Sequence, residues 1–212
     1  MYIRFIENIK ETINLQTTGN YQMPLIKKQN FDLVNKKVRS FNNRSTDCVG
    51  IHFFIDDYQF DRLWNNPTQY VSLFQKYQFI CSPDYSLYLD YPIALQIYNT
   101  YKKQALGAYY QSQGIKVIPT VSWSNEASFD FCFDGIEYGS TVACSSVGCL
   151  HSEFCKGLFI KGFKKMIEVI NPEQILMNGK LPDELSSYNE LCIFIKPFHE
   201  EIKERMKLND KN

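Results

Sequence analysis

The chain has 212 residues, and its 23 Lys and Arg side chains are balanced by 23 Asp and Glu side chains, so the formal net charge is zero. A zero net charge argues against a protein whose main task is to grip a polyphosphate backbone, although a local basic patch is compatible with it. Apolar residues make up 44% and charged residues 22% of the sequence, which is typical of a globular chain. The length suits one domain of ordinary size.

The seven cysteines are odd in number and show no framework spacing, which predicts free thiols in a reducing cytoplasm. The N-terminus does not resemble a signal peptide, because Arg4, Glu7 and Lys10 interrupt any apolar stretch. No segment approaches the roughly 18 apolar residues that a membrane span needs. We therefore expect a soluble, cytoplasmic protein without membrane contacts.

The first 45 residues differ from the rest and are predicted to form an N-terminal helix and a polar arm. Isoleucines at near-helical spacing predict a short helix over residues 3–14. Residues 16–30 are polar and contain Gly19 and Pro24, as in a loop or arm. Basic residues then follow at Lys36, Lys37, Arg39 and Arg44, and we interpret them as a solvated face.

Residues 46–198 are predicted to form an α/β domain, because short apolar runs alternate with segments that suit helices. The predicted strands are residues 49–55, 78–82, 115–122, 140–146 and 174–177, with a sixth short strand at 193–195. The predicted helices are residues 58–77, 91–113, 126–133 and 153–170. This alternation indicates βαβ units with mostly parallel strands. Five to six such strands fit an incomplete (β/α) barrel-like sheet, which we slightly favour, or an open doubly wound sheet.

Glycine and proline support several of these boundaries. Gly114 stands where a helix should stop, and Asn171-Pro172 closes the next long helix. Pro119 conflicts with the predicted strand 115–122, because proline cannot donate to a ladder; that strand must be at an edge, bulged or shorter. The remaining residues, 199–212, are predicted to form a charged C-terminal helix or tail.

Polar residues follow the predicted strands, where parallel α/β folds place their sites. Asp56 and Asp84 are candidates to hold a cation or act as base, with Glu126 as the partner acid. Mg²⁺ or Mn²⁺ is the candidate cation. The candidate ligand-binding residues are Asp57, Ser122, Trp123, Asn125 and Asn178, with Trp123 stacking on a ring. The alternatives are that the carboxylates and amides cap helices and that Trp123 is a core residue.

Sulfur chemistry is a weaker alternative. Cys144, Cys149, His151 and Cys155 fall within twelve residues, but spacings of four and five intervening residues do not form a tight zinc knuckle, so no metal site is predicted. A cysteine–histidine nucleophile would need a thiol beside an imidazole, and with seven cysteines and three histidines chance proximity is the simpler interpretation. Common nucleotide-hydrolase, dinucleotide-binding, serine-hydrolase and zinc-protease motifs are absent from the sequence.

Four strings occur in order: IHFFIDDYQF at 51–60 with WNNP at 64–67, CSPDYS at 81–86, GIKVIPTVSW at 114–123 and FDFCFDG at 129–135. Together they resemble the family called domain of unknown function 4417, over roughly residues 45–180. The resemblance implies a phage or mobile-element origin, and it brings no activity with it.

Three functions follow as hypotheses. The first is a protein that binds a small ligand, a nucleotide or nucleotide-sugar, at the strand ends and hydrolyses it. The alternative is a non-enzymatic phage accessory protein that binds a host defence or replication protein through an exposed aromatic patch. The third and less favoured is nucleic-acid binding through the basic residues of the N-terminal arm.

Overall fold

The structure is a computed structural model that describes residues 15–43 and 48–197. Two parallel sheets form its centre. The first contains β3 (Val38–Ser40), β4 (Gly50–His52), β5 (Phe79–Cys81) and β6 (Val117–Ile118). The second contains β7 (Val142–Ser145), β8 (Ile175–Asn178) and β9 (Cys192–Ile195). The predicted α/β class with parallel strands is confirmed.

The strands follow one another in space in the same order as in the chain. Each neighbouring pair is parallel, and a single bridge between Thr120 and Ala143 links the first sheet to the second. A doubly wound sheet would reverse its strand order at one point, and neither sheet does so. No ladder joins β9 to β3 in the described part of the chain, so the barrel is not closed. The fold is therefore an open parallel α/β arrangement, and no closed barrel is formed by the described residues.

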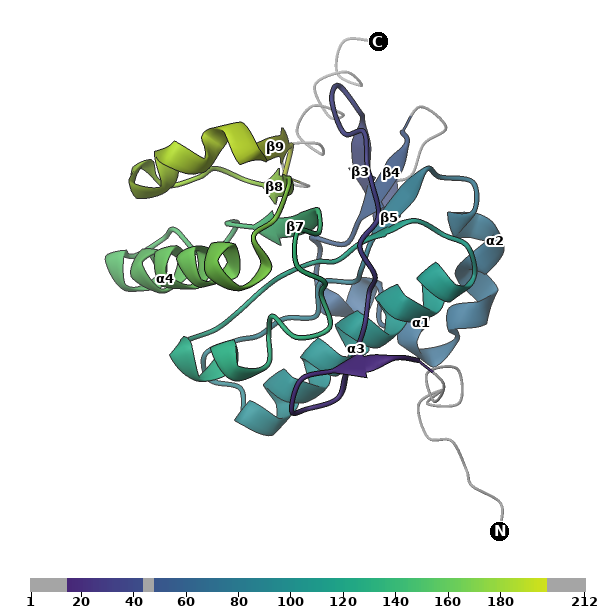
Figure 1. The fold of residues 1–212 in the computed structure, drawn as a ribbon, viewed down its shortest axis with the longest axis horizontal. Coiled ribbons are helices and arrows are strands. Elements are labelled where there is room, and N and C mark those ends of the chain that lie inside the picture. The colour runs from purple at the N-terminus through teal and green to yellow at the C-terminus, as the bar shows by residue number, and fades with distance from the viewer. Residues whose placement is uncertain (1–14, 44–47, 198–212) are drawn as a thin grey trace.

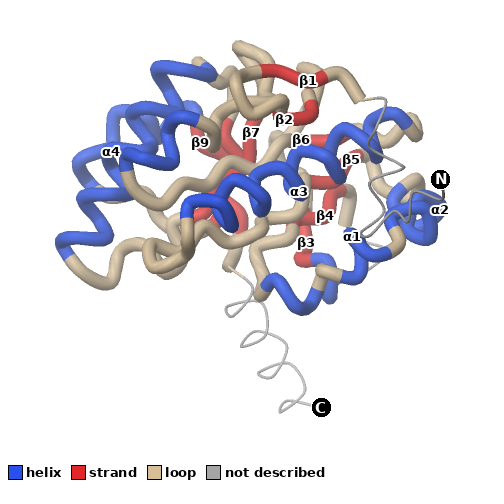
Figure 2. Tube along the Cα trace, turned by 90° about the horizontal axis from the view of Figure 1, so that it is seen from below, coloured by secondary structure: helices blue, strands red, loops and turns tan. Residues whose placement is uncertain are grey.

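The two sheets share one interior. Its buried side chains come from six of the seven parallel strands: Val38, Phe79, Cys81, Ile118, Ala143, Leu176 and Ile195. Because successive side chains of a strand point to opposite faces, the intervening residues pack outward against the helices. Figure 2 shows the strands gathered in the middle with the helices around them.

Four helices lie outside the strands (Figure 1): α1 (Arg62–Asn65), α2 (Val71–Phe74), α3 (Ile93–Ser112) and α4 (Glu153–Ile170). The predictions for α3 and α4 are confirmed within two residues. The single helix predicted for residues 58–77 is wrong, because Pro67 interrupts the backbone hydrogen bonds and the chain makes a 3₁₀ turn between α1 and α2. The helix predicted for residues 126–133 is a 3₁₀ turn at Glu126–Asp130.

The conflict over Pro119 is resolved by a short strand. β6 ends at Ile118, immediately before the proline. The carbonyl of Pro119 accepts a hydrogen bond from Ala143 N at 2.9 Å, and Val121 N donates to the carbonyl of Ala143 at 2.8 Å. Pro119 therefore lies where the chain passes from the first sheet to the second, and its missing N–H breaks no ladder inside a sheet.

The segment expected to be a polar arm packs on the domain instead. It supplies the antiparallel pair β1 (Thr17–Thr18) and β2 (Met23–Pro24), and then β3 of the first sheet. Ile26 is fully buried against α3, where the missing side chain of Gly107 makes room for it. The expected helix 3–14 and the tail 199–212 lie outside the described residues.

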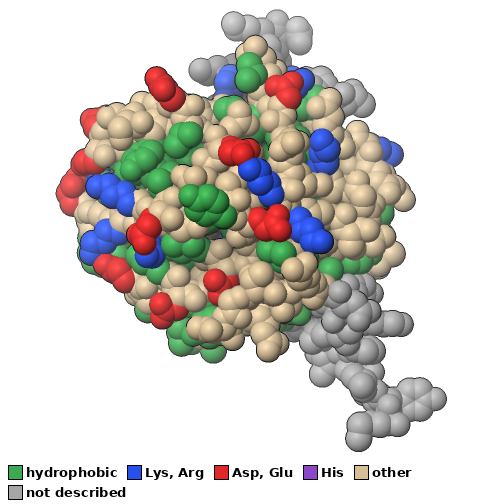
Figure 3. Space-filling view, viewed as in Figure 1, with side chains coloured by type: hydrophobic (Ala, Val, Ile, Leu, Met, Phe, Trp, Pro, Cys, Tyr) green, Lys and Arg blue, Asp and Glu red, His purple; other side chains and the backbone are tan. Residues whose placement is uncertain are grey.

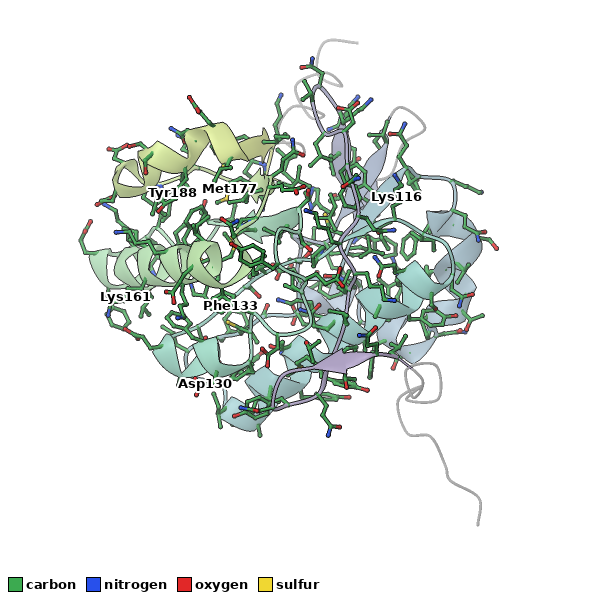
Figure 4. All side chains as sticks on the ribbon, in the orientation of Figure 1. Lys116, Asp130, Phe133, Lys161, Met177 and Tyr188 are labelled. Carbon is green, nitrogen blue, oxygen red and sulfur yellow. The ribbon has the colours of Figure 1, made fainter. Side chains whose placement is uncertain are left out.

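An apolar core fills the space between α4 and the second sheet. Figure 4 shows Met177 of β8 and Tyr188 beside α4, and Phe133 on the other side of that helix. Tyr188 belongs to a 3₁₀ segment at Asp183–Leu191 that sequence reasoning missed, and its ring centroid is 5.6 Å from that of Phe163. This half of the molecule is thus held together by aromatic and aliphatic contacts.

The surface shows no dominance of one charge sign on the face drawn in Figure 3, where acidic and basic side chains lie next to one another. Ion pairs such as Lys28–Glu173 and Lys165–Glu168 contribute to this mixture. Within residues 15–43 and 48–197, none of the helices combines the length and the apolar character that crossing a bilayer would require.

Candidate functional site

A polar stripe on α3 organises the loops at the strand ends. Gln96, Asn99 and Lys103 are buried although they are polar or charged, and their spacing of three and four residues puts them on neighbouring positions of one helix face. Asn99 Nδ2 donates to the carbonyl of Ser86 at 2.8 Å. Gln96 Oε1 accepts from Ser124 Oγ at 2.6 Å. The helix therefore fixes the loops that follow β5 and β6.

The centre of the site is an ion pair between Asp84 and Lys103. Lys103 Nζ lies 3.3 Å from Asp84 Oδ1 and also donates to Ser122 Oγ. The side chain of Lys103 is only 2% exposed and that of Asp84 is 21% exposed. Because the aspartate comes from the end of β5 and the serine from the segment after β6, this pair ties two strand ends to α3.

Burial raises the pKa of Asp84 above its ordinary value. The positive charge of Lys103 opposes the rise, the negative charge of Asp57 adds to it, and the hydrogen bonds from Lys103 and Ser122 oppose it. The net direction is upward, so this carboxyl group holds a proton more readily than an exposed aspartate. A carboxyl group of this kind suits proton transfer.

Asp57 positions the loop after β5. Its carboxylate accepts two hydrogen bonds from Ser86, one from the backbone N at 3.0 Å and one from Oγ at 2.8 Å. Both carboxylate oxygens of Asp57 are therefore used in hydrogen bonds to Ser86. Asp57 affects the site by holding Ser86 in place and by raising the pKa of Asp84 with its negative charge.

Two adjoining cavities open at the strand ends. The larger has a volume of about 480 Å³ and is lined by the loops after β5, β6 and β7 and by the start of α4. The smaller has a volume of about 280 Å³ and lies toward the ends of β4 and β8. Both are lined by Asp84, Ser86, Ser145 and Val147. Asp84 of the ion pair therefore lies in the wall shared by the two cavities.

Asn178 brings an unsatisfied oxygen to the smaller cavity. Its Nδ2 donates to Ser145 Oγ at 2.9 Å, whereas its buried Oδ1 has no hydrogen-bond partner among the described residues. A buried polar atom left without a partner costs about 1–3 kcal/mol. The amide of Asn178 is thus a polar group in the wall of the smaller cavity, and its oxygen has unused hydrogen-bonding capacity.

Trp123 lies between the larger cavity and α4. It lines that cavity, its Nε1 donates to the carbonyl of Leu158 at 3.3 Å, and its ring centroid is 5.5 Å from that of Phe159. Gly162 makes room for the indole, because a Cβ there would lie 2.1 Å from Nε1. The side chain is half-buried, so it packs on the helix and still forms part of the cavity wall.

The other candidate residues are not all in the cavities. Asp56 is exposed, lines the smaller cavity and accepts a hydrogen bond from Gln59 Nε2 at 3.1 Å. Asn125 caps the following 3₁₀ turn by accepting from Ala127 N at 3.1 Å, as the capping alternative expects. Glu126 lines neither cavity.

Glu126 instead pairs with Lys161 on α4, and the hydrogen bond from that lysine lowers the pKa of the carboxyl group. Figure 4 shows Lys161 on the outer side of α4, away from the strands.

Lys103 was not predicted from the sequence, and Ser86 and Ser145 were expected at the strand ends without a role of their own. Lys103 belongs to a helix, whereas the predicted site residues follow strands. A detectable signal was the run of polar residues at helical spacing within α3, opposite its apolar positions.

The basic residues lie away from the two cavities at the strand ends, and the cysteines form no disulfide. Lys36, Lys37 and Arg39 line a third cavity of about 220 Å³ together with Phe194, Ile195 and Lys196, between β3 and β9. All seven cysteines are free, as predicted. Among the described side chains, no three from His, Cys, Asp and Glu form a group that could hold a metal ion.

The fold and the cavities define a parallel α/β protein with a polar site at the carboxyl ends of its strands. The chain belongs to the family described as Domain of unknown function (DUF4417), whose model matches residues 15–196.

Two related proteins come from phages. The chain is 42% identical over 131 residues to the Gene 1 protein of Mycobacterium phage L5 and 41% identical over 131 residues to that of Mycobacterium phage D29. The matched stretch covers 62% of this chain but 57% and 48% of those proteins, so it spans about half of their length. No solved structure matches the chain significantly.

Proposed function

We propose that the protein binds a small ligand of the nucleotide or nucleotide-sugar class in the two adjoining cavities at the strand ends. The observation that carries this proposal is that Asp84, Ser86 and Ser145 line both cavities, so one ligand can contact the same polar centre from either side. Small-molecule sites usually measure about 300–1,000 Å³ and combine apolar walls with a few polar groups. The larger cavity falls in this range.

The walls suit a flat ring joined to a polar group. Trp123 and Phe159 provide aromatic surface in the larger cavity. Ser122, Ser86 and Asn178 offer hydroxyl and amide groups around the ion pair. Stacking on an aromatic wall is worth about 1–3 kcal/mol per base. The unsatisfied oxygen of Asn178 would gain its missing partner from a ligand hydroxyl or amine.

The charge of the lining favours the nucleoside or sugar part of such a ligand. Asp56, Asp84 and Asp90 line the two cavities, and none of the residues that line them is Lys or Arg. Carboxylates repel bare phosphates, so phosphate groups would enter together with a divalent cation such as Mg²⁺ or Mn²⁺. Binding of a nucleotide should therefore depend on Mg²⁺, and binding of the matching nucleoside should not.

Acid–base hydrolysis follows as the reaction. Asp84, with its raised pKa, would donate a proton to the leaving group, and the exposed carboxylate of Asp56 would activate a water molecule. Lys103 would hold Asp84 in place. Glu126 has no part in this scheme, because it lines neither cavity.

The test is calorimetric titration of the full chain with nucleosides, nucleotides and nucleotide-sugars, each with and without Mg²⁺. Replacing Asn178→Leu exchanges the amide for an apolar side chain of similar size, and it should weaken binding at least tenfold. The control is Glu168→Gln, an exposed residue paired with Lys165 on the surface of α4. If Asn178→Leu and the unchanged chain bind the same ligand with equal affinity, the proposal is wrong.

A second candidate is a partner protein, for which the mouth of the larger cavity is the supporting observation. Tyr88, Leu89 and Val147 line it and are exposed, and Leu150 and Phe154 are exposed close by in the chain. Exposed apolar patches often mark interaction surfaces. Replacing Leu150→Ser and Phe154→Ser together, at positions that line neither cavity, should abolish capture of a host protein if this candidate is right. If the protein instead binds a nucleotide, the same variant should bind it as the unchanged chain does.

Nucleic-acid binding is the third candidate. The cluster of Lys36, Lys37, Arg39 and Lys196 around the cavity between β3 and β9 is the feature in its favour. The proposal predicts an affinity that falls steeply with salt concentration. In each case the protein would act in the cytoplasm of the host cell, where its seven free thiols stay reduced.

A further inference from the structure

The larger cavity also holds a pair of side chains that the proposed ligand site does not use. His151 and Cys155 line its wall, at the end of the loop after β7 and in the first turn of α4. Cys155 Sγ lies 3.5 Å from His151 Nε2. This distance is within the range of a hydrogen bond to sulfur, so the thiol and the imidazole are in direct contact.

The orientation of the imidazole is fixed by the backbone. His151 Nδ1 lies 2.7 Å from the carbonyl oxygen of Gly148. A carbonyl oxygen can only accept a hydrogen bond, so Nδ1 carries the proton of the neutral ring. Nε2 is therefore left with its lone pair directed at the thiol of Cys155. A nucleophile, a base and a group that orients the base are thus arranged in sequence.

Local structure explains why these residues meet. His151 directly precedes the N-cap Ser152, and Cys155 lies in the first turn of α4, so the chain turns back at the cap and brings the two side chains together. Ser152 caps α4, because its Oγ accepts from Cys155 N at 3.2 Å and fixes the first turn. Gly148 has a φ of 82°, a left-handed conformation that glycine adopts without strain, and its carbonyl is the one that His151 contacts.

A second thiol in the same cavity provides an internal comparison. Cys149 also lines it, but its Sγ faces the carbonyl of Val147 at 3.9 Å and has no imidazole beside it. Burial raises the pKa of Cys149 to about 11, with smaller contributions from Asp84 and Cys155. The other five cysteines are buried. Cys155 is therefore the thiol best placed to react.

We propose that Cys155, with His151 as its base, is a nucleophile that accepts an acyl group from an activated acyl compound, a thioester or an activated ester. Leu87, Leu158 and Phe159 line the same cavity and suit an apolar acyl chain. The acyl transfer uses neither Asp84 nor Asn178, but its substrate would share the larger cavity and the side chain of Phe159 with the proposed nucleotide ligand.

In the proposed reaction, His151 carries the thiol proton to the leaving group while Cys155 takes the acyl group. The thiol proton moves to His151 Nε2, and Sγ forms a bond to the carbonyl carbon of the substrate. The bond from that carbon to the leaving thiol or alcohol then breaks, and the leaving group takes the proton from Nε2. A thioester remains on Cys155. Water cleaves it by the same route, which releases a carboxylic acid and restores the thiol.

The experiment is incubation of the full chain with p-nitrophenyl butyrate at pH 7, followed by intact-protein mass spectrometry and peptide mapping. One butyryl group is expected on Cys155. Cys155→Ser should show none, and Cys149→Ser should show the same group at the same rate as the unchanged chain. His151→Gln should acylate at least tenfold more slowly at pH 7. The difference should narrow at alkaline pH, where thiols ionise without a base.

The proposal is overturned if Cys149 is acylated before Cys155, if His151→Gln reacts as fast as the unchanged chain at pH 7, or if the folded chain neither carries a butyryl group nor releases p-nitrophenol faster than Cys155→Ser does. A purely structural role for His151 would not produce a pH-dependent rescue. Circular dichroism of each variant shows whether it is folded.

Discussion

The two halves of the molecule bury different kinds of side chain. In the half built on β3–β6, the long helix α3 buries Gln96, Asn99, Lys103 and Gln104. In the half built on β7–β9, the long helix α4 buries the apolar residues Phe159, Phe163, Met166 and Ile170. α3 is therefore held by polar contacts to the strand-end loops and also by an apolar face that includes Ala105, Leu106 and Tyr110, whereas α4 buries an apolar face alone.

The ends of the two helices show the same contrast. α4 starts at the N-cap Ser152 and stops at Asn171, which has a φ of 46° in the left-handed region. α3 has no side-chain cap at its start, where Pro92 precedes it. The start of α4 is thus specified by a neighbouring side chain, whereas the start of α3 is not; the end of α3 is marked by Gly114, which has a φ of 77°. The comparison teaches that α3 links the site to the first core through polar contacts, whereas α4 presents an apolar face to the second core and to the wall of the larger cavity.

The largest effect is expected from breaking the ion pair of the first half. Lys103→Met leaves the carboxylate of Asp84 without its counter-ion in a mostly buried place, and removal of one partner of a buried pair costs about 3–5 kcal/mol. The free energy of unfolding, measured by urea denaturation, should fall by about that amount. The double replacement Lys103→Met with Asp84→Asn should recover most of the loss. A loss below about 1 kcal/mol in the single variant would show that the pair is solvated.

The free energy of unfolding should depend on pH through the buried side chain of His52. His52 of β4 is fully buried, and burial lowers its pKa from 6.5 to about 3. The unfolded chain therefore binds a proton below pH 6.5 that the folded chain does not, so the free energy of unfolding falls as the pH decreases from 6.5 toward 3. The expected contribution of this one group is up to about 1.4 kcal/mol per pH unit.

His52→Asn removes this titration and keeps an acceptor for Phe54 N, which now donates to His52 Nδ1 at 3.2 Å. Urea denaturation of both proteins at pH 7, 6, 5 and 4 gives the two slopes. Equal slopes would mean that His52 is protonated in the folded protein.

Two glycines of α4 test the contact between that helix and the site. Gly162→Ala should destabilise the protein by about 1–3 kcal/mol, because the new Cβ would lie 2.1 Å from Trp123 Nε1 and the indole would have to move. Gly157→Ala, in the same helix, meets no atom within 4 Å and should stabilise the protein by about 0.5–1 kcal/mol. Thermal unfolding of the two variants measures the difference. If both are stabilised, Trp123 is not packed against α4.

The smallest effect is expected at the cap of α4. Ser152→Ala removes the acceptor of Cys155 N and should cost about 1 kcal/mol. Ser152→Asp keeps an acceptor at the same position and should restore the stability, which chemical denaturation can measure. If Ser152→Ala leaves the free energy of unfolding unchanged, the cap does not stabilise α4, and the helix is held by its apolar face alone.

Most of the fold was predictable where local signals were strong. α4 was predicted with its observed ends, because Ser152, Asn171 and Pro172 mark them and the apolar spacing between them is regular. β3 was missed because it has only three residues within a basic, polar segment, and its pairing with β4 is a tertiary contact.

The site was predictable in part for a similar reason. Strand ends converge in a parallel fold, so Asp56, Asp84, Ser122, Trp123 and Asn178 could be named, and all of them line the two cavities. Lys103 could not, because only the packing of α3 brings its long side chain to the ends of β5 and β6. The contact of Glu126 with Lys161 likewise depends on how α4 lies beside the preceding turn.

The central claim is that the polar cavities around Asp84 hold a small ligand. The most direct test is native mass spectrometry of the purified chain before and after incubation with a nucleotide-rich cell extract. We expect a small mass to be retained by the unchanged protein and lost on Trp123→Ala, with circular dichroism showing that the variant is folded. If the folded, unchanged protein retains no small mass, or if Trp123→Ala retains the same one, the account of this site is contradicted.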